Sequence, residues 1–448
     1  MDHELWTKEM NYHQTLNYLY SQLPMFTRDG ASAFKKDLDN TLELCRRLDD
    51  PQHKFKSVHI GGTNGKGSTS HMLAAVLQVA GYKTGLYTSP HLKDFRERIR
   101  INGVMINEAY VVEFVAKHQA DFEEIKPSFF EMTVAMAFDV FAREKVDIAI
   151  IEVGLGGRLD STNVINPLLS VITNIGWDHM NMLGDTLQLI AGEKAGIIKP
   201  QKPVIIGEYQ PEVSQVFIDK ARSVEAPLSF ASEEWSLEVK GERQKVKGFG
   251  RLEIRVNDSG LVTPGSELRT QDLILDLTGT YQLKNVKTVL SAVAELRRQG
   301  FVIADEHVAR ALQQVGKLTG LRGRWEVLDQ NPLIICDTGH NPEGIAEVLK
   351  NIKRIDYEAL HFVMGVVNDK DLTKILAMLP KEATYYFCRP DIPRGLDAEN
   401  LKQQAADFGL NGEAYSSVNA ALKAARSAAG KDDLVFVGGS TFVVAEII

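Results

Sequence analysis

A glycine-rich loop with one lysine, "VHIGGTNGKGSTS" at residues 58–70, has the composition of a phosphate-binding site. The common nucleotide loop reads G-x-x-x-x-G-K-[ST], with a hydroxyl directly after the lysine. Here Gly65 and Lys66 match, but Gly67 takes the hydroxyl position, and the hydroxyls begin one step late at Ser68. A glycine turn between a strand and a helix still points backbone N–H groups at an anion. The loop therefore predicts a nucleotide site in which Lys66 reaches the β- and γ-phosphates.

Polar residues follow several other apolar segments, at the edge where open α/β sheets bind ligands. Glu152 lies near the end of "VDIAIIEV", where an acidic residue can hold Mg²⁺ beside a bound nucleotide. Ser89 ends "TGLYTS", and Asp178 and His179 follow "SVITNI". An acid or a histidine at such a place can also serve only as a cap or a core residue. Together with the glycine loop, these residues favour a metal and phosphate site.

Further charged residues leave two interpretations open. Lys194 lies on a predicted helix, where a solvent-exposed lysine is the simpler interpretation. Arg96, Arg98 and Arg100 recur at every second position. They form either a basic stripe for an anionic substrate or a solvated strand edge.

The segments that must position these residues alternate between two patterns. β-branched runs without polar alternation predict parallel strands that are buried on both faces, at 57–60, 84–89, 146–153 and 170–175. The stretch 70–81 has helical spacing and ends at Gly81. One face of this predicted helix carries Met72, Leu73, Val76, Leu77 and Ala80.

The second half of the chain starts differently. Residues 232–277 alternate polar and apolar side chains between turn residues, which predicts a small antiparallel β element. Residues 283–300 predict a helix that ends at Gly300. Parallel-type strand patterns then return at 333–337, 360–367, 384–388 and 433–439.

These patterns predict an α/β protein with two domains. Residues 1–300 form a P-loop domain on a central sheet, with the small antiparallel β element attached. A linker at about 300–330 leads to a C-terminal, doubly wound, Rossmann-like α/β domain at 301–448. Asp337 and His340 flank the end of its first predicted strand.

Composition excludes some classes of function. The 448 residues are 44% hydrophobic and 25% charged, as in soluble globular proteins. The net charge of −8 disfavours nucleic-acid binding, which usually needs an excess of basic residues. The three cysteines lie far apart without metal-binding spacing, which favours a reducing compartment. The N-terminus is polar, and no apolar run approaches the ~18 residues of a membrane span. We therefore expect a cytoplasmic protein without membrane or nucleic-acid partners.

The motifs taken together resemble one family. "GTNGKGS" is similar to the nucleotide loop of the Mur ligase superfamily, and its glycine after the lysine resembles the folylpolyglutamate synthase and dihydrofolate synthase branch. Further matches follow in order: "TSPHL", "EVGLGGRLDSTN", "GWDHMNMLGDTLQLIAGEKAGIIK", and "GRWEV" before "DTGHNP". The chain departs from the family at "YQLKN", where Tyr281 replaces a histidine, and at "DTGHNP", where the family has "DGAHNP". The resemblance extends from about residue 20 to residue 445.

The resemblance implies roles for individual residues. ATP is bound by Asn64, Gly65, Lys66, Gly67, Ser68, Asn285, Arg324, Asp337 and His340. Mg²⁺ is held by Ser89, Glu152 and His179. The catalytic residues are Lys66, His179 and Lys194, the last as a carbamate that holds metal beside the γ-phosphate. The pterin substrate is contacted by Phe130, Thr133, His91 and Arg158. Phe129 or Phe130 can stack on a flat heterocycle, although core packing explains most apolar residues of that segment.

The same resemblance implies an activity. Members of the branch are ATP-dependent ligases that add L-glutamate to a folate through an acyl phosphate, and they are usually monomers. "TSPHL" with His91 favours the bifunctional type, which also makes dihydrofolate from dihydropteroate. The alternatives are another Mur-type amino-acid ligase and a P-loop ATPase switch without ligase activity. The absence of an N-K-x-D motif argues against a GTPase.

Overall fold

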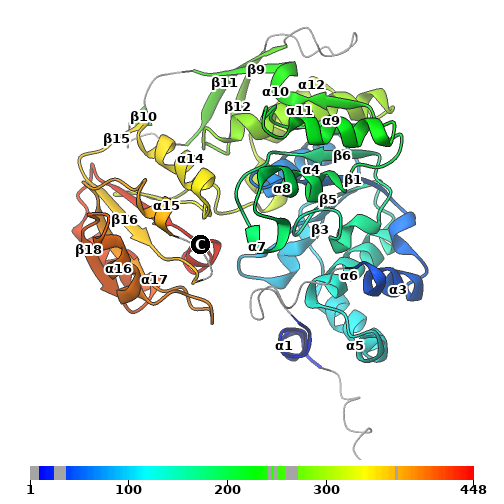
Figure 1. The fold of residues 1–448 in the computed structure, drawn as a ribbon, viewed down its shortest axis with the longest axis horizontal. Helices are drawn as coiled ribbons and strands as arrows, with labels where there is room; N and C mark the ends of the chain where they lie inside the picture. Colours follow the sequence, from blue (N-terminus) through cyan, green and yellow to red (C-terminus); the bar gives the residue numbers. More distant parts are fainter. Residues whose placement is uncertain (1–9, 25–36, 241–243, 246–249, 259–270, 369–371) are drawn as a thin grey trace, which may run out of the picture.

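The computed structural model describes residues 10–24, 37–240, 244–245, 250–258, 271–368 and 372–448. Two α/β units lie side by side, the larger coloured blue to green and the smaller yellow to red, with a third sheet above the larger unit (Figure 1). This arrangement confirms the predicted fold class. None of the helices in the described residues combines the length and apolar character that a membrane crossing requires.

In the described residues, the larger unit has an eight-stranded sheet with the order β4-β3-β2-β5-β1-β6-β7-β8. Its strands are β1 Lys56–Gly61, β2 Thr84–Tyr87, β3 Ile99–Ile101, β4 Val104–Met105, β5 Ile148–Glu152, β6 Leu169–Ile172, β7 Val204–Ile206 and β8 Leu228–Phe230. The β2–β3 and β3–β4 pairs are antiparallel, and the other pairs are parallel. Ile60 pairs with Glu152, and Gly61 pairs with Ile172, so three strands end together beside the glycine loop.

Helices cover both faces of this sheet. One face packs against α4 Lys66–Val79, α11 Gln282–Arg298, α12 Asp305–Leu312 and α13 Val315–Thr319. The other face packs against α3 Asp39–Arg47, α5 Glu108–Ile125, α6 Phe129–Arg143, α8 Leu187–Ala195 and α9 Ser214–Ser223. Shorter or peripheral helices are α1 Tyr12–Gln22, α7 Met180–Leu183 and α10 Ala231–Glu234. On β5, Ile148 and Ile150 enter the first core, whereas Ala149 and Ile151 enter the second. Burial on both faces explains why the strand sequences do not alternate.

Helix α4 differs from the prediction of a single apolar face. It begins at Lys66, before the predicted residue 70, and every residue from Ser68 to Leu77 is buried. The helix lies between the sheet on one side and α11, α12 and α13 on the other. A helix enclosed on all sides needs no polar stripe. The enclosure anchors the glycine loop to the centre of the fold.

The third sheet is antiparallel, with the order β12-β11-β9. Its strands are β9 Trp235–Val239, β11 Leu252–Asp258 and β12 Gln271–Leu275. Leu252, Ile254 and Val256 alternate with exposed residues along β11 and join the core around α11. This sheet confirms the antiparallel element predicted at 232–277, of which 241–243, 246–249 and 259–270 lie outside the described residues. A short strand, β10 Gln244–Lys245, pairs with β15 Ile355–Asp356.

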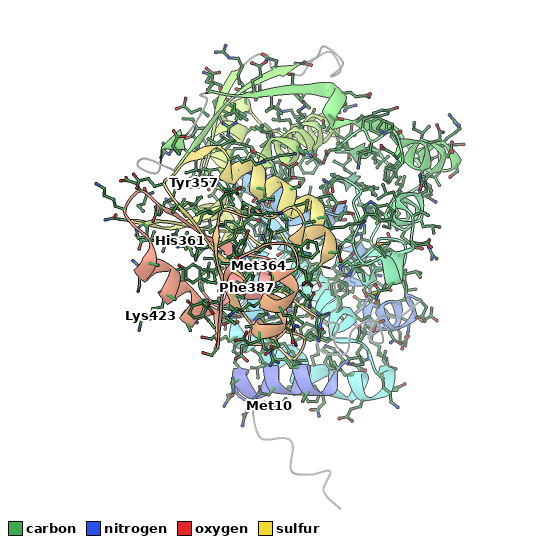
Figure 2. All side chains as sticks on the ribbon, turned by 60° about the vertical axis from the view of Figure 1, so that its left-hand side comes forward. Met10, Tyr357, His361, Met364, Phe387 and Lys423 are labelled. Carbon is green, nitrogen blue, oxygen red and sulfur yellow. The ribbon has the colours of Figure 1, made fainter. Side chains whose placement is uncertain are left out.

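The smaller unit is built on a sheet of six strands in the described residues, with the order β13-β14-β19-β16-β17-β18. The strands are β13 Glu326–Gln330, β14 Leu333–Cys336, β16 Leu360–Met364, β17 Thr384–Cys388, β18 Gly412–Tyr415 and β19 Leu434–Gly438. One face packs on α14 Pro342–Ile352, α15 Thr373–Leu376 and α16 Ala398–Ala406, and the other on α17 Val418–Ala428 and α18 Thr441–Ala445. Met364 and Phe387 pair across β16 and β17 inside this unit (Figure 2). Helices on both faces make the unit doubly wound.

The structure bears on where the two domains divide. Val308 and Leu312 of α12, and Val315 of α13, belong to the core around α4. Residues 301–319 therefore pack with the larger unit, although they follow residue 300. We propose that the division falls near Gly320, inside the predicted linker at about 300–330, rather than at residue 300.

Candidate active site

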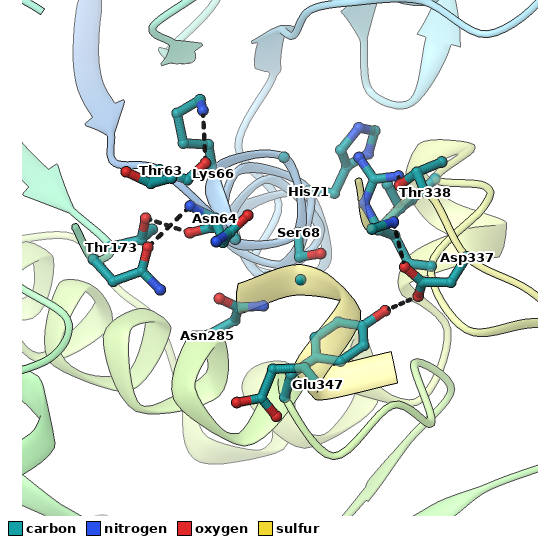
Figure 3. Close-up of a pocket in the computed structure, with 18 of the residues that line it drawn as sticks. Thr63, Asn64, Lys66, Ser68, His71, Thr173, Asn285, Asp337, Thr338 and Glu347 are labelled. Atoms are coloured by element: carbon teal, nitrogen blue, oxygen red, sulfur yellow. Dashed lines mark hydrogen bonds between the residues drawn. The ribbon is translucent and has the colours of Figure 1, made fainter. Parts of the chain in front are cut away.

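A cavity of about 440 Å³ lies where the glycine loop, the strand ends of the first sheet and the C-terminal domain meet (Figure 3). Its lining includes many of the residues that the sequence suggested: Asn64, Gly65, Lys66, Gly67, Ser68, Ser89, Glu152, Asn285, Arg324, Asp337 and His340. The other suggested residues do not line it: His91, Phe130, Thr133, Arg158, His179 and Lys194. The structure thus brings the suggested nucleotide residues together and places the suggested pterin residues elsewhere.

The glycine loop connects β1 to α4 through a left-handed residue. Gly65 has φ +86°, and a Cβ there would collide with the Asn285 side-chain oxygen, so the position requires glycine. The Asn64 N–H donates to Asn174 Oδ1 at 2.9 Å, which ties the loop to the segment after β6. The Lys66 Nζ donates to Gly62 O at 3.1 Å and remains at the cavity wall. The loop therefore presents the start of a helix and a lysine to one cavity, as phosphate binding requires.

Lys194 of α8 contacts the same loop but does not line the cavity. Its Nζ donates to Gly62 O at 3.0 Å, the carbonyl oxygen that Lys66 also uses. Burial, together with the Lys66 ammonium, lowers the pKa of Lys194 to about 7. The interpretation of Lys194 as a solvent-exposed lysine is therefore wrong, because only 4% of this residue is exposed.

Glu152 and Ser89 form an oxygen-rich corner beside Gly67. The Ser89 N–H donates to Glu152 Oε2 at 3.1 Å. Burial raises the pKa of Glu152 to about 7, while Lys66 and Arg324 act in the opposite direction. A Cβ on Gly67 would lie 3.7 Å from Glu152 Oε1, so the glycine leaves the carboxylate open to the loop.

These donors fit a magnesium ion. Mg²⁺ prefers oxygen ligands and usually takes one or two carboxylates from the protein, with water and substrate phosphates completing its shell. Glu152 and Ser89 supply a carboxylate and a hydroxyl at the cavity wall. No cluster of three or more His, Cys, Asp or Glu residues suited to a metal occurs in the described part of the chain.

His179 is in a different place from these two residues. It has φ +50° and directly precedes the short helix α7 as its N-cap, and its Nε2 lies 3.8 Å from Asp178 Oδ2. The same Asp178 oxygen lies 3.7 Å from His340 Nε2 of the C-terminal domain. His179 is therefore one residue away from a contact between the domains, and its role as a metal ligand stays a prediction.

Asp337 organises the C-terminal side of the cavity. It is buried and accepts hydrogen bonds from the Trp325 N–H at 2.8 Å, the Gly339 N–H at 2.7 Å and the Tyr281 hydroxyl. Burial and this carboxylate raise the pKa of the Tyr281 hydroxyl, which therefore stays protonated as a donor. Tyr281 stands where the family that the sequence resembles has a histidine. Its hydrogen bond to Asp337 links the larger unit to the C-terminal domain.

We expect Tyr281→Phe to destabilise the protein by about 1–3 kcal/mol, because a buried carboxylate loses one of its donors. Chemical denaturation monitored by circular dichroism measures the loss. Tyr357→Phe is a matched control, since Tyr357 is a partly buried tyrosine of the same core whose hydroxyl forms no hydrogen bond with another described residue (Figure 2). Equal stability of the two variants would contradict the role of Tyr281.

Arg324 points from the C-terminal domain toward the loop. It donates to Gly323 O at 3.3 Å and to the Thr338 hydroxyl. A Cβ on Gly67 would lie 3.6 Å from its Nη2, so the guanidinium reaches the phosphate-binding turn. On the other side of the turn, Asn285 donates to Gln282, and Gln282 donates to Ser68 Oγ at 3.3 Å. The turn is therefore held between α11 and the C-terminal domain.

The residues suggested for a pterin are spread over a second region. Phe130 is partly buried with its ring 6.2 Å from that of Tyr87, and it packs over Gly154. Thr133 is fully buried and donates to Phe129 O at 2.7 Å, so its hydroxyl is already used.

His91 and Arg158 also have partners in the protein. The His91 Nδ1 accepts from Arg98 Nε at 2.7 Å, and burial lowers the pKa of His91 to about 3. Arg158 pairs with Glu193 at 2.8 Å and is largely exposed. Phe130 is the one of these four that has a benzene ring.

Several residues at or beside the cavity were not predicted. Asn341 donates to Asn64 Oδ1 at 3.0 Å and so links the C-terminal domain to the glycine loop. Asn341 belongs to the motif "DTGHNP", but the motif did not predict its contact with the glycine loop. His71, Asn174 and Lys284 line the cavity itself. His71 lies in a helical stretch whose pattern indicates only core packing, so no feature of the sequence distinguished it as a site residue.

Comparisons with known proteins identify the family. The Mur ligase middle domain matches residues 60–293, and the Mur ligase glutamate ligase domain matches residues 323–441. A dihydrofolate synthase/folylpolyglutamate synthase of Bacillus subtilis is 31% identical over 97% of this chain and 98% of its own length. A probable bifunctional folylpolyglutamate synthase/dihydropteroate synthase of Haloferax volcanii is 34% identical over 98% of this chain, which spans 50% of that relative.

Solved structures give the same result. Escherichia coli FolC in complex with DHPP and ADP superposes with a TM-score of 0.82 and 29% identity, covering 98% of this chain and 97% of that one. The Yersinia pestis bifunctional folylpolyglutamate synthase/dihydrofolate synthase complexed with AMPPNP and Mn ion gives a TM-score of 0.80 and 29% identity, over 98% and 97% of the two chains. With its loop, its strand-end acid and both family domains in place, the chain belongs to the Mur ligase family, in the folylpolyglutamate synthase/dihydrofolate synthase branch.

Proposed function

We propose that this protein is an ATP-dependent carbon–nitrogen ligase that adds L-glutamate to folates and to dihydropteroate. The observation that carries the proposal is the single cavity that joins Lys66, the Glu152–Ser89 corner and Arg324. Relatives in the same family are named for both synthase activities, and one solved neighbour binds DHPP and ADP. The cavity supplies what an ATP-driven amide synthesis needs, namely a phosphate loop, a metal corner and a second domain.

The chemistry begins with a carboxylate that is too stable to react with an amine. Transfer of the γ-phosphoryl group of ATP converts it to an acyl phosphate, which has a good leaving group. The amino group of L-glutamate attacks the acyl carbon, and the tetrahedral intermediate collapses to an amide and phosphate. Lys66 and Arg324, which line the same cavity, stabilise the negative charge on the transferring group. When bound to Glu152 and Ser89, Mg²⁺ supplies further charge neutralisation at the β- and γ-phosphates.

The remaining residues position the nucleotide and exclude water. Asn285, Ser68, Asp337 and His340 line the same cavity and surround the ATP in this proposal. The Asn341–Asn64 hydrogen bond holds the C-terminal domain over the loop, which protects an acyl phosphate from hydrolysis. Lys194 acts as a carbamate, whose negative charge faces Lys66 in place of a second cation. Phe130 stacks on the pterin ring.

The proposal includes the setting of the enzyme. We propose a cytoplasmic monomer, since the three cysteines are free and buried and the substrates are small molecules. The net charge of −8 argues against a nucleic-acid partner.

The direct test is incubation of the protein with MgATP, L-glutamate and dihydropteroate, followed by mass spectrometry of the pterin product. We expect ATP-dependent gain of one glutamyl unit, and further units when tetrahydrofolate is the substrate. No gain with dihydropteroate but gain with tetrahydrofolate would leave a dedicated folylpolyglutamate synthase. ATP hydrolysis without any amide product would favour a P-loop ATPase switch, and amide formation only with other acceptors would favour another Mur-type ligase.

A further inference from the structure

One part of the cavity has no role in the mechanism above. It is lined by His71 of α4, Arg100 of β3 and Gly320 at the end of α13. In Figure 3, His71 lies on the same side of the pocket as Thr338 and away from Lys66. This part therefore faces the C-terminal domain, beyond the phosphate-binding turn.

Arg100 is a buried cation that forms no ion pair with a described residue, although the carboxylates of Glu97 and Asp94 act on it from a greater distance. Only 9% of the residue is exposed, so the solvated-edge interpretation is wrong for it. Its Nη1 donates to Gly103 O at 3.1 Å, and its guanidinium lies so close to Gly320 that a Cβ there would be 2.8 Å from Nη1. Its Nε has no hydrogen-bond partner, and no carboxylate lies within ion-pair distance, among the residues that the structure describes. A buried guanidinium in this state is suited to an anion that enters from the cavity.

His71 offers the complementary group, a hydrogen-bond acceptor. The Thr319 hydroxyl donates to Val315 O at 2.7 Å, so its oxygen accepts from His71 Nδ1 at 2.8 Å. This assigns the proton to Nδ1 and leaves Nε2 with a lone pair. Burial, with Arg100 and Arg324 nearby, lowers the pKa of His71 to about 3, which keeps the ring neutral. Thr319 thus bonds to His71, and the next residue, Gly320, lies against the guanidinium of Arg100.

We propose that Arg100 and His71 bind the α-amino-acid end of L-glutamate, with Arg100 donating to the α-carboxylate and His71 Nε2 accepting from the amino group. An α-amino acid carries an anion and an N–H donor on neighbouring atoms, and this pair presents a cation beside an acceptor. The site lies in the same cavity as Lys66 and Arg324, so an amine held there faces the acyl phosphate. The inference rests on the proposed function, because it names the site of that reaction's second substrate.

The test separates the Michaelis constants of the two substrates. We expect Arg100→Gln to raise KM for L-glutamate by about 10- to 100-fold, because the substrate loses a charge-assisted hydrogen bond. KM for ATP should change less than about twofold. Arg297→Gln is the control, because Arg297 is a partly buried arginine that also donates to a backbone carbonyl, Ile303 O, and that pairs with Asp305, but it does not line the cavity. This control should leave KM for L-glutamate unchanged.

An analogue identifies which carboxylate is bound. The wild-type protein should prefer L-glutamate strongly over its α-amide, and Arg100→Gln should lose most of that preference. If the preference over the α-amide is unchanged, and preference over L-glutamine falls instead, Arg100 binds the side-chain carboxylate and the assignment is overturned. If KM for ATP rises as much as KM for L-glutamate, the anion at Arg100 is a phosphate, which overturns it as well.

Two variants test His71 by geometry. His71→Asn keeps an amide donor near the Nδ1 position for Thr319 but removes the cavity acceptor, whereas His71→Gln places an amide oxygen near Nε2. We expect the asparagine variant to raise KM for L-glutamate severalfold and the glutamine variant to restore most of it, with equal melting temperatures. Equal KM values in both would show a structural role only. A wild-type protein that forms no glutamyl product would instead contradict the proposed function itself.

Discussion

Lys66→Ala should lower the ligase turnover number by about 1000-fold or more, while the fold stays intact. Removal of one preorganised donor to a transition-state charge typically costs 100- to 1000-fold, and phosphoryl transfer depends on such donors almost entirely. Lys66 sits at the first position of α4, where the helix N-terminus and the ammonium act on the same anion. Steady-state rates of ADP release in the presence of all three substrates measure the loss.

The control for this variant is another lysine of the same unit. Lys145 is exposed, at the turn before β5, and lies away from the cavity. Lys145→Ala should keep the wild-type turnover number. A Lys66→Ala protein that melts normally and keeps more than a tenth of the activity would contradict the assignment of Lys66 to the transferring phosphate.

The ligand-binding edge of the first sheet could be predicted because parallel strands impose it. Gly61, Glu152 and Ile172 end neighbouring strands, so the residues that follow them must meet whatever the rest of the chain does. Glycine at position 65 similarly indicates a left-handed backbone conformation that other residues rarely adopt. Local chemistry was sufficient for these positions.

Contacts between distant segments could not be predicted in this way. Asn341 meets Asn64 and Asp178 approaches His340 only because the C-terminal domain folds back over the loop. Helix α4 appeared one-sided in sequence, since its polar residues, such as Ser70, are small enough to be buried. The spacing of Arg96, Arg98 and Arg100 was also consistent with an exposed strand edge, but Gly320 at the end of α13 packs against Arg100. Such covering depends on elements more than 200 residues away in the chain.

Lys194→Ala should reduce activity by at least about 100-fold and should recover part of it when acetate or propionate is added. We propose that the Lys194 amine reacts with carbon dioxide to give a carbamate and a proton. Two ammonium groups that donate to the same Gly62 oxygen repel each other, and conversion of one to an anion turns the repulsion into attraction. A small carboxylate that diffuses into the space left by the alanine replaces that negative charge.

The pH dependence of this modification follows from the direction of the shift. Only the neutral amine reacts with carbon dioxide, and the pKa of Lys194 is lowered to about 7, so the modified fraction should rise as pH increases from 6 to 8. Carbon-13 NMR of the protein in labelled bicarbonate detects the carbamate. Lys199 is the matched control, because burial lowers its pKa to about 8, yet its Nζ donates to Asn163 O, away from Lys66. Lys199→Ala should keep both the labelled signal and the activity. A lowered pKa alone does not distinguish the two lysines, whereas proximity to Lys66 does. A carbamate at Lys194 would be ruled out if the labelled signal disappeared in Lys199→Ala. It would also be ruled out if no added carboxylate restored the activity of Lys194→Ala.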